Sequence, residues 1–388
     1  MSDTNRVALS YEKEGATYAT APASALEDVR YTGETLVHDT SSVSSEEIRS
    51  DRNISDVTRT GVGASGDTNH ELSYAEFDDW LESGLLSATW STADTGIENS
   101  VTTSVAAGTG VYTIDSTTWT VTPAVGDLLE IRGDAEAANN GYKVVTAATT
   151  TTFTVAETGT AVSAAQTLVI DILSQITNGT TFASYHLQKE FTDLTNIFEL
   201  LEGMVIEGLN LEAALEGIVS LSFNWTGKQA VSPAPAATFA ARNAVTANEV
   251  MNTVDHIPTQ GEGAAHDAIC LTNFTMALVN NTRQLNCLGQ LGANDIGLGH
   301  VEITGGIQLY LEDSALMNLY TGNTATELIL VFEDTLGNGY IVFLPQLKFS
   351  AGSRTAPSQD ADVIVDLTYT AYLDATYGYA LRIARFAA

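Results

Sequence analysis

Basic residues are scarce in this sequence of 388 residues, and lysine is the scarcest of them. There are 16 Lys and Arg against 48 Asp and Glu, which gives a formal net charge of -32 at pH 7. Binding to DNA or RNA through phosphate neutralisation requires clustered Lys and Arg, so the composition excludes that class of protein. An anionic membrane surface would repel the chain for the same reason. Many carboxylates with few lysines are also typical of adaptation to high salt.

Cysteines and long apolar runs are scarce as well. Cys270 and Cys287 are the only two cysteines, too few for a disulfide scaffold. The longest apolar stretches, such as Leu328–Phe332, are too short to span a bilayer. Met1–Ala8 is polar and lacks the apolar segment of a secretory signal. We therefore expect a protein made in the cytoplasm, without membrane association, that reaches any other location by assembly and release.

Apolar residues are plentiful enough for a folded core. They make up 44% of the sequence, which argues against disorder. The length allows one large domain or two to three smaller ones. Changes in residue composition along the chain predict three sections: 1–92, an inserted domain at 93–168, and 169–388. The first and last sections would form one main domain.

The first section predicts two short strands and one helix. Val29–Thr32 and Thr35–His38 read as strands separated by Gly33. Ser73 and Glu76 have the spacing of a capping box at the start of a helix. The helix would bury a stripe formed by Phe77, Leu81 and Leu85. Its acidic residues would face solvent: Asp78, Asp79 and Glu82.

The second section is rich in Thr, Ala and Gly, and it contains several short strand candidates. The turn Asn139-Asn140-Gly141 is a strong hairpin signal. Short strands at regular spacing predict a small barrel or sandwich. The candidates are Val111–Asp115, Trp119–Thr122, Leu128–Arg132, Tyr142–Val145 and Phe153–Ala156.

The third section continues the β pattern, so the predicted fold is mainly β. Leu328–Phe332 and Tyr340–Leu344 form a predicted hairpin across Gly337-Asn338-Gly339. A short helix is expected near Ser314–Tyr320, and Ser232–Ala241 reads as a loop. Further predicted strands are Leu187–Phe191, Met204–Leu211, Ile218–Trp225, Val363–Tyr372 and Tyr379–Phe386.

The sequence contains no convincing catalytic motif. Gly61–Gly66 matches G-x-G-x-x-G, but its polar flanks do not supply the buried strand and helix of a dinucleotide site. The spacing of His256, His266, Asp267 and Cys270 matches no common zinc pattern. P-loop, H-E-x-x-H and G-x-S-x-G motifs are absent from the sequence. We therefore expect no catalytic, cofactor-binding or metal-binding residues, and no enzyme.

A family resemblance lies in Val43–Arg52 and its continuation to Gly61. This segment resembles the signature segment of the tail tube proteins of long-tailed, non-contractile phages. It follows Val29–Leu36 and precedes Glu71–Tyr74, and the similar segments of that family occur in the same order. Later segments match as well: Phe191-Thr192-Asp193, Gly203-Met204, Asn224–Lys228, Gly337–Tyr340 and Leu344-Pro345. The stretch Val125–Asp127 through Asn139–Tyr142 also resembles a small barrel module found in such proteins. The acidity and the scarcity of lysine depart from the family pattern.

The resemblance implies a tail-tube β-barrel or sandwich with a flanking α-helix, plus the inserted small β-barrel domain. It implies homo-oligomeric rings, usually hexameric, that stack around a channel in the virion tail. DNA would pass through this channel during ejection without specific binding. The implied partners are other copies of the chain and other tail proteins, such as the tape measure, tail terminator and distal tail proteins.

A run of alternating charges provides candidate subunit contacts. Residues 1–60 have few aliphatic side chains, as expected of an arm that becomes ordered between neighbouring subunits. Arginine forms bidentate pairs with carboxylates, here those of a neighbour. The alternative is a solvated charged loop, because exposed ion pairs contribute only ~0–1 kcal/mol. The candidates are Glu46, Glu47, Arg49, Asp51, Arg52 and Arg59.

Two other classes of function remain open from the sequence. A virion decoration protein or receptor-binding adhesin would also be built from β-domains. It would need an exposed aromatic cleft or a trimeric stalk, and Trp90, Trp119 and Trp225 lie on separate predicted elements. A hydrolase that uses paired carboxylates has no motif to support it.

Overall fold

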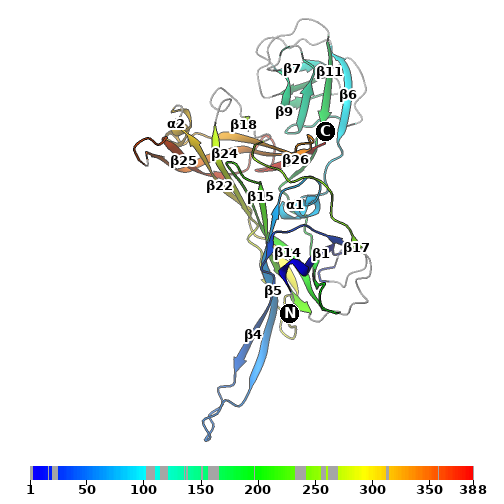
Figure 1. Ribbon diagram of the computed structural model, residues 1–388, viewed down its shortest axis with the longest axis vertical. Coiled ribbons are helices and arrows are strands. Elements are labelled where there is room, and N and C mark those ends of the chain that lie inside the picture. Colours follow the sequence, from blue (N-terminus) through cyan, green and yellow to red (C-terminus); the bar gives the residue numbers. More distant parts are fainter. Residues whose placement is uncertain are drawn as a thin grey trace.

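The protein is mainly β. The computed structural model describes residues 3–15, 17–19, 25–101, 110–113, 121–134, 136, 139–149, 152–155, 166–195, 197–231, 242–254, 259–260, 270–311, 314–356 and 358–387. The predicted loop Ser232–Ala241 and part of the predicted strand Trp119–Thr122 lie outside these residues. Within them, the largest sheet links eighteen strands (Figure 1).

Three long strands organise this sheet: β5 (Val57–Glu71), β14 (Phe198–Ala214) and β24 (Gly339–Thr355). Each exchanges partners along its length. The first half of β14 pairs with β13 (Tyr185–Phe191), whereas its second half pairs with β15 (Ser220–Gly227). Because each long strand bridges two groups of partners, one continuous hydrogen-bonded network surrounds the core.

The remaining strands extend these groups on either side. One run follows the order β4-β5-β15-β14-β19-β22-β25-β24-β23, and a second follows β17-β2-β1-β13-β14-β16. β26 pairs with both β24 and β12. The bounds are β1 (Val7–Lys13), β2 (Leu26–Asp28), β3 (Gly33–Glu34), β4 (Val37–Ser44), β12 (Ser174–Thr177), β16 (Gln229–Val231), β17 (Arg242–Asn243), β18 (Thr259–Gln260), β19 (Leu271–Val279), β22 (Glu302–Tyr310), β23 (Thr326–Glu333), β25 (Ile364–Ala371) and β26 (Arg382–Phe386).

Smaller elements complete the described part. β20 (Arg283–Leu285) and β21 (Asp295–Gly297) form a separate hairpin. The helices are η1 (Thr4–Arg6), α1 (Asp78–Gly84) and α2 (Ala315–Gly322). α2 confirms the short helix predicted near Ser314–Tyr320.

Aromatic packing around α1 forms the centre of the core. Trp80 is 1% exposed. Its ring lies 5.0 Å from Trp225, 5.3 Å from Phe223 and 5.1 Å from Tyr11, centroid to centroid. Such edge-to-face and tilted contacts add to the free energy gained by burying the rings. The helix thereby joins strands from both runs of the sheet.

The predicted capping box at α1 is wrong. The helix begins at Asp78, after Ala75 adopts a positive φ of 60°, and Ser73 instead forms an isolated β-bridge with Val250. The Glu76 carboxylate accepts hydrogen bonds from the backbone N–H groups of Arg30 and Thr246, at 3.1 and 2.8 Å. It therefore serves distant segments rather than its own helix.

The prediction that the acidic side chains of α1 all face solvent is wrong. Glu82 is buried and accepts a hydrogen bond from Lys13 Nζ at 2.7 Å. Asp78 pairs with Arg385. Burial of these carboxylates is tolerated because each has a cation from a packed strand, β1 or β26.

Most strand predictions agree with the structure, and two of the exceptions have a clear local cause. Val29–Thr32 is not a strand, because its backbone bonds elsewhere: the Arg30 carbonyl contacts His70 Nδ1 at 2.7 Å. The last strand begins at Arg382 rather than at the predicted Tyr379. The N–H groups of Ala380 and Leu381 both donate to Asn178 Oδ1 instead of to a neighbouring strand.

Six strands between Asp94 and Ile172 form a second sheet, in the order β6-β11-β8-β9-β10-β7. Tyr112 stacks on Phe153 at 4.9 Å in its core. The edge strands do not pair with each other in the described residues, so neither this sheet nor the larger one closes into the predicted barrel. Domain boundaries at 93 and 168 stay a prediction. The bounds are β6 (Asp94–Val101), β7 (Val111–Thr113), β8 (Leu128–Arg132), β9 (Gly141–Ala148), β10 (Thr152–Val155) and β11 (Gln166–Ile172).

A polar junction beneath the six-stranded sheet attaches it to the main sheet. The guanidinium of Arg382, on β26, donates through Nη1 to the Gly126 carbonyl at 2.6 Å, to Asp127 Oδ1 at 2.8 Å and to Gln175 Oε1 at 2.9 Å. The Tyr379 ring lies under the same guanidinium, 4.3 Å away. Apolar side chains from both sheets surround the junction, including Leu128, Val144, Ile341, Phe343 and Phe386.

We expect Arg382→Ala to lower the free energy of unfolding by about 3 kcal/mol, because it leaves the largely buried carboxylate of Asp127 without its cation. Chemical denaturation followed by circular dichroism measures this change, and limited proteolysis reports loosening near Gly126. Arg354→Ala is the matched control, since Arg354 is exposed on β24. Equal stability of the two variants would contradict this account of the junction.

A buried histidine makes the core sensitive to acid. His70 is packed against Phe77, Trp80 and Phe223, with centroid distances of 4.8, 5.2 and 5.7 Å. Burial lowers the pKa of His70 from 6.5 to about 4. The imidazole is therefore neutral in the folded protein at pH 7 and donates from Nδ1 to the Arg30 carbonyl.

We expect the stability of the protein to fall as the pH drops from about 6.5 to about 4. In this range the unfolded chain binds a proton at His70 and the folded protein does not, so protonation favours unfolding. His70→Phe should flatten this dependence by about 2–3 kcal/mol. Denaturation at pH 7 and pH 4.5 for both proteins measures the difference, and identical pH dependence would refute the role of His70.

Candidate subunit interface

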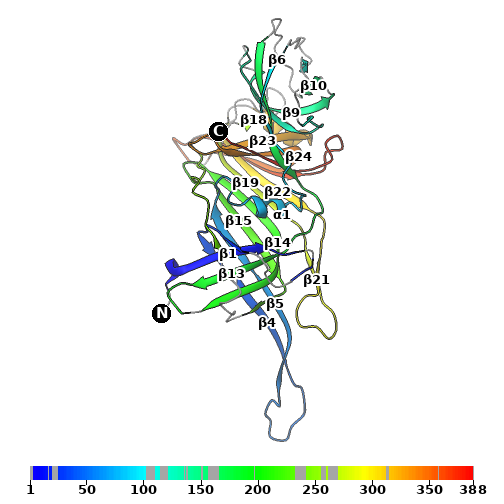
Figure 2. The same cartoon turned by 90° about the vertical axis from the view of Figure 1, so that its right-hand side faces the viewer.

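A long hairpin formed by β4 and β5 projects from the body of the protein (Figures 1 and 2). Its register runs from Val37 opposite Ser65 to Ser44 opposite Val57. β15, the partner of β5 on the other side, ends where Gly227 faces Ala64. Residues 57–63 of β5 therefore pair with β4 alone in the described part of the chain, and residues 57–60 are exposed to solvent.

The sequence of the hairpin explains why it stands clear of the core. Its strands are rich in Ser, Thr and Gly and lack an apolar face that could be buried. Gly61 permits close approach of the strands, because a Cβ there would lie 2.5 Å from Ser41 Oγ. A bulge between Ser41 and Ser42 offsets the register.

The arm is shorter than the predicted residues 1–60. Leu9 and Tyr11 on β1, together with Val29 and Leu36, are buried in the main core. Sparse aliphatic residues are sufficient here because the rest of the main sheet supplies their packing partners. Residues 39–60 of the hairpin are all exposed and lack such contacts.

The hairpin tip brings together five of the six predicted contact residues: Glu46, Glu47, Arg49, Asp51 and Arg52. All are exposed, and the sixth, Arg59, lies on β5. Ser45 and Asp56 close the tip through a backbone hydrogen bond of 2.9 Å. Arg52 has a positive φ of 60°.

Arg49 is engaged within its own chain. Its guanidinium donates Nε–H and Nη2–H to the two carboxylate oxygens of Asp51, at 3.0 and 2.9 Å. This pairing lowers the pKa of Asp51 to about 2. Arg52 and Arg59 have no ion pair among the described residues. They are thus better placed than Arg49 to pair with a neighbour, and the interface itself stays a prediction.

Exposed apolar side chains at the tip were not predicted as contact residues. Ile48 is fully exposed, and Val43, Ile54 and Val57 are more than half exposed. Apolar residues between charged ones, in a segment too polar to have its own core, were the signal that sequence reasoning missed. Together with the charged residues they give the tip the mixed character of a contact surface.

A groove of about 460 Å³ lies at the base of the hairpin. Residues 39–41 and 60–63 form one wall. The other wall is formed by residues of the β20–β21 hairpin: Gln284, Asn286, Cys287, Gln290 and Gly292. Gln284 fixes this second wall by donating to the Gly227 carbonyl at 3.1 Å. The lining is mostly polar backbone and small side chains.

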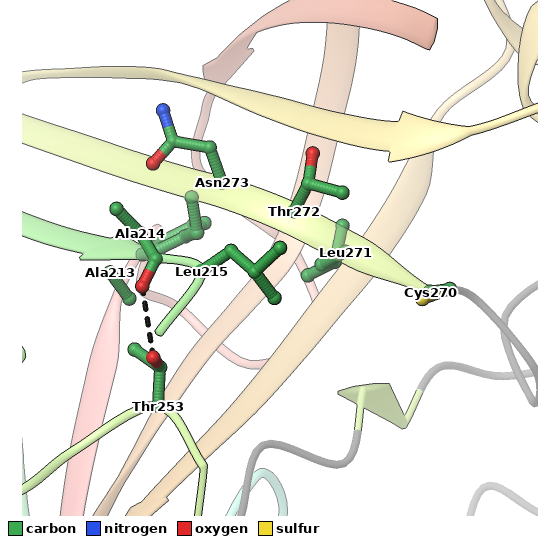
Figure 3. A pocket seen from close by; sticks show the side chains of 9 residues that line it. Ala213, Ala214, Leu215, Thr253, Cys270, Leu271, Thr272 and Asn273 are labelled. Carbon is green, nitrogen blue, oxygen red and sulfur yellow. Dashed lines mark hydrogen bonds between the residues drawn. The ribbon is translucent and has the colours of Figure 1, made fainter. Parts of the chain in front are cut away.

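A second pocket, of about 270 Å³, lies at the opposite end of the sheet, where β14 ends and β19 begins (Figure 3). Thr253 donates its hydroxyl to the Ala214 carbonyl there, at 2.9 Å. Cys270 is exposed at its edge. None of the described residues that line this pocket is a base that could activate the thiol.

The described residues hold no cluster of three or more metal-ligating side chains. His256, His266 and Asp267 lie outside these residues. Gly61–Gly66 is part of strand β5 and is not a loop between a strand and a helix. No helix in the described part of the chain has the length and hydropathy needed to cross a bilayer.

Comparison with known proteins identifies the family of the chain. A search of curated proteins gives no match. The family model described as phage tail tube protein matches residues 4–371, which is nearly the whole chain and includes both the hairpin and the six-stranded sheet. The chain therefore belongs to the phage tail tube protein family.

Proposed function

We propose that this protein forms hexameric rings that stack into a tail tube, the conduit for genome DNA during ejection. Membership of the family makes it a structural protein of the virion tail, and implies self-assembly into a tube together with other tail proteins. The family is one of structural proteins rather than enzymes. The main observation in support of the proposal is the projecting hairpin, whose two strands pair only with each other beyond the body of the protein.

Exposed strand edges support contacts between copies. β4 and residues 57–63 of β5 present backbone N–H and C=O groups that no other described strand pairs with. Such edges aggregate unless they are covered, and a closed ring of subunits covers them in an ordered way. Within the described residues of one subunit, neither sheet closes into a barrel. In this proposal, neighbouring subunits complete the β-lined channel.

The tip would then contact a subunit of the next ring. Arg52 and Arg59 would pair with carboxylates of that subunit, and Ile48 would be buried against it. Bidentate arginine–carboxylate pairs give such a contact its orientation. Glu46, Glu47 and Asp51 keep the tip mixed in charge, so that it does not bind polyanions indiscriminately.

Charge suits the proposed conduit. Each subunit contributes a net charge of -32, so a ring of six would be strongly anionic. Carboxylates that line a channel repel phosphates, so DNA would pass without binding. No cofactor or metal is needed for this function.

The six-stranded sheet would lie on the outer surface of the tube, because a unit of that size would obstruct the channel. We retain the predicted division into 1–92, 93–168 and 169–388 as part of this proposal. The tape measure, tail terminator and distal tail proteins are the proposed partners at the channel and at the two ends of the tube.

Negative-stain electron microscopy of the purified protein, at low and at molar salt, tests this function. We expect hollow tubes or rings with a regular axial repeat. Molar salt shortens the Debye length to about 3 Å, so it should both relieve repulsion between subunits and weaken the charged tip contacts. Discrete particles that never stack at any salt or concentration, even with tail initiator proteins present, would contradict the proposal.

Arg52→Glu should impair stacking. The substitution replaces an attractive contact with a repulsive one, which we expect to weaken each contact by about 1–2 kcal/mol and to raise the critical concentration for assembly about tenfold. Sedimentation at a series of concentrations measures this value. Arg354→Glu makes the same charge change at an exposed residue of β24 and serves as the control. Normal tubes from Arg52→Glu and Arg59→Glu would remove the charged tip from the interface.

A further inference from the structure

The end of β20 and the loop that joins it to β21 expose apolar side chains without any charge. We call residues Gln284–Asn294 the leucine loop. Its eleven residues contain no Asp, Glu, Lys or Arg, although the chain as a whole carries a net charge of -32. Leu288 is fully exposed, and Leu285 and Leu291 are nearly half exposed. No other segment of the described residues exposes three large apolar side chains within seven positions.

The leucine loop is held in place from both of its ends. Gln284 donates to Thr226 Oγ1 and to the Gly227 carbonyl, at 3.3 and 3.1 Å. At the other end, Ala293 is buried beside Val205 and Ile296. A loop fixed in this way loses little conformational entropy when its exposed side chains are covered.

A glycine lets the leucine loop pack against the body. Gly292 has a φ of +84°, and a Cβ there would lie 3.0 Å from the Lys228 carbonyl oxygen and 3.1 Å from Val62 Cγ2. The loop therefore lies directly against β5 and the residue that follows β15. It also forms one wall of the groove whose other wall is the base of the β4–β5 hairpin. Both hairpins leave the same end of the body (Figure 2).

We propose that the leucine loop is a docking surface for a second copy of this chain, separate from the charged hairpin tip. The proposal rests on the tube-forming function above. Two copies of an acidic chain repel each other wherever carboxylates meet, so an uncharged apolar segment is where they can approach without paired charges. Its shared groove makes it continuous with the proposed hairpin interface.

The two contacts should respond to salt in opposite ways. Screening weakens ion pairs at the hairpin tip. Apolar burial at Leu288 is not screened, and strongly hydrated salts such as sulfate reinforce it. The leucine loop would therefore hold subunits together under the high-salt conditions that weaken the tip.

Cys287 provides a native reporter, since it is exposed and adjacent to Leu288. In a Cys270→Ser background, a maleimide reagent should label Cys287 in dispersed subunits and fail to label it in assembled tubes. Equal labelling in subunits and tubes would overturn the docking surface and leave the tube function standing. A chain that never associates under any condition would overturn both proposals.

Leu288→Asp tests the same surface by substitution. Because Leu288 is fully exposed, the variant should keep the thermal stability of the wild-type subunit. It should raise the critical concentration for assembly in molar sulfate by at least about tenfold. Leu336→Asp makes the same change at another exposed leucine, in the β23–β24 turn, and should assemble normally. Normal assembly of Leu288→Asp, or equal impairment of Leu336→Asp, would refute a specific role for the leucine loop.

Discussion

Repulsion between like charges constrains every contact that this protein makes with a copy of itself. With 48 acidic and 16 basic residues, two subunits attract each other only where carboxylates are paired or absent. Many of the scarce cations are committed inside the subunit: Lys13 to Glu82, Lys189 to Glu34 and Arg382 to Asp127. The cations left at the β4–β5 hairpin, Arg52 and Arg59, are therefore valuable for contacts between subunits. Under the same constraint, an uncharged exposed segment such as the leucine loop is a place where two copies can approach each other without repulsion.

The fold resolves a second constraint, which is how to expose strand edges for assembly without losing the core. Three long strands each exchange partners along their length, so the hydrogen-bonded network stays continuous while β4 and β5 extend beyond it. Aromatic packing between Trp80 and Trp225 holds α1 against the sheet. A rigid body carrying a projecting hairpin is suited to repeated, identical contacts.

The sequence predicts the regular parts of this fold well. The alternation in Val363–Tyr372 and the Gly337-Asn338-Gly339 turn each have a local physical cause, and the structure confirms the strands they predict. Elsewhere, hydrogen bonds between residues distant in sequence override the local sequence patterns. Glu76 looks like a capping residue in sequence but accepts from Arg30 and Thr246, and neither could be identified as its partner from spacing. Closure of a barrel depends on edge pairing, which strand propensity does not specify.

The candidate interface was predictable in part. The charge pattern selects six candidate contact residues, and the hairpin brings five of them together at its tip. The ion pair between Arg49 and Asp51 could not be predicted from the sequence, because the backbone geometry decides whether opposite charges that are close in sequence form a pair. The leucine loop was missed because its leucines look like core residues until their exposure is known.

The most direct test of the whole account is a cryo-electron microscopy reconstruction of the assembled protein. The account predicts a hollow tube in which residues 37–63 of each subunit lie against a subunit of the next ring. A tube in which this hairpin extends freely into solvent, or an assembly without a channel, would contradict it.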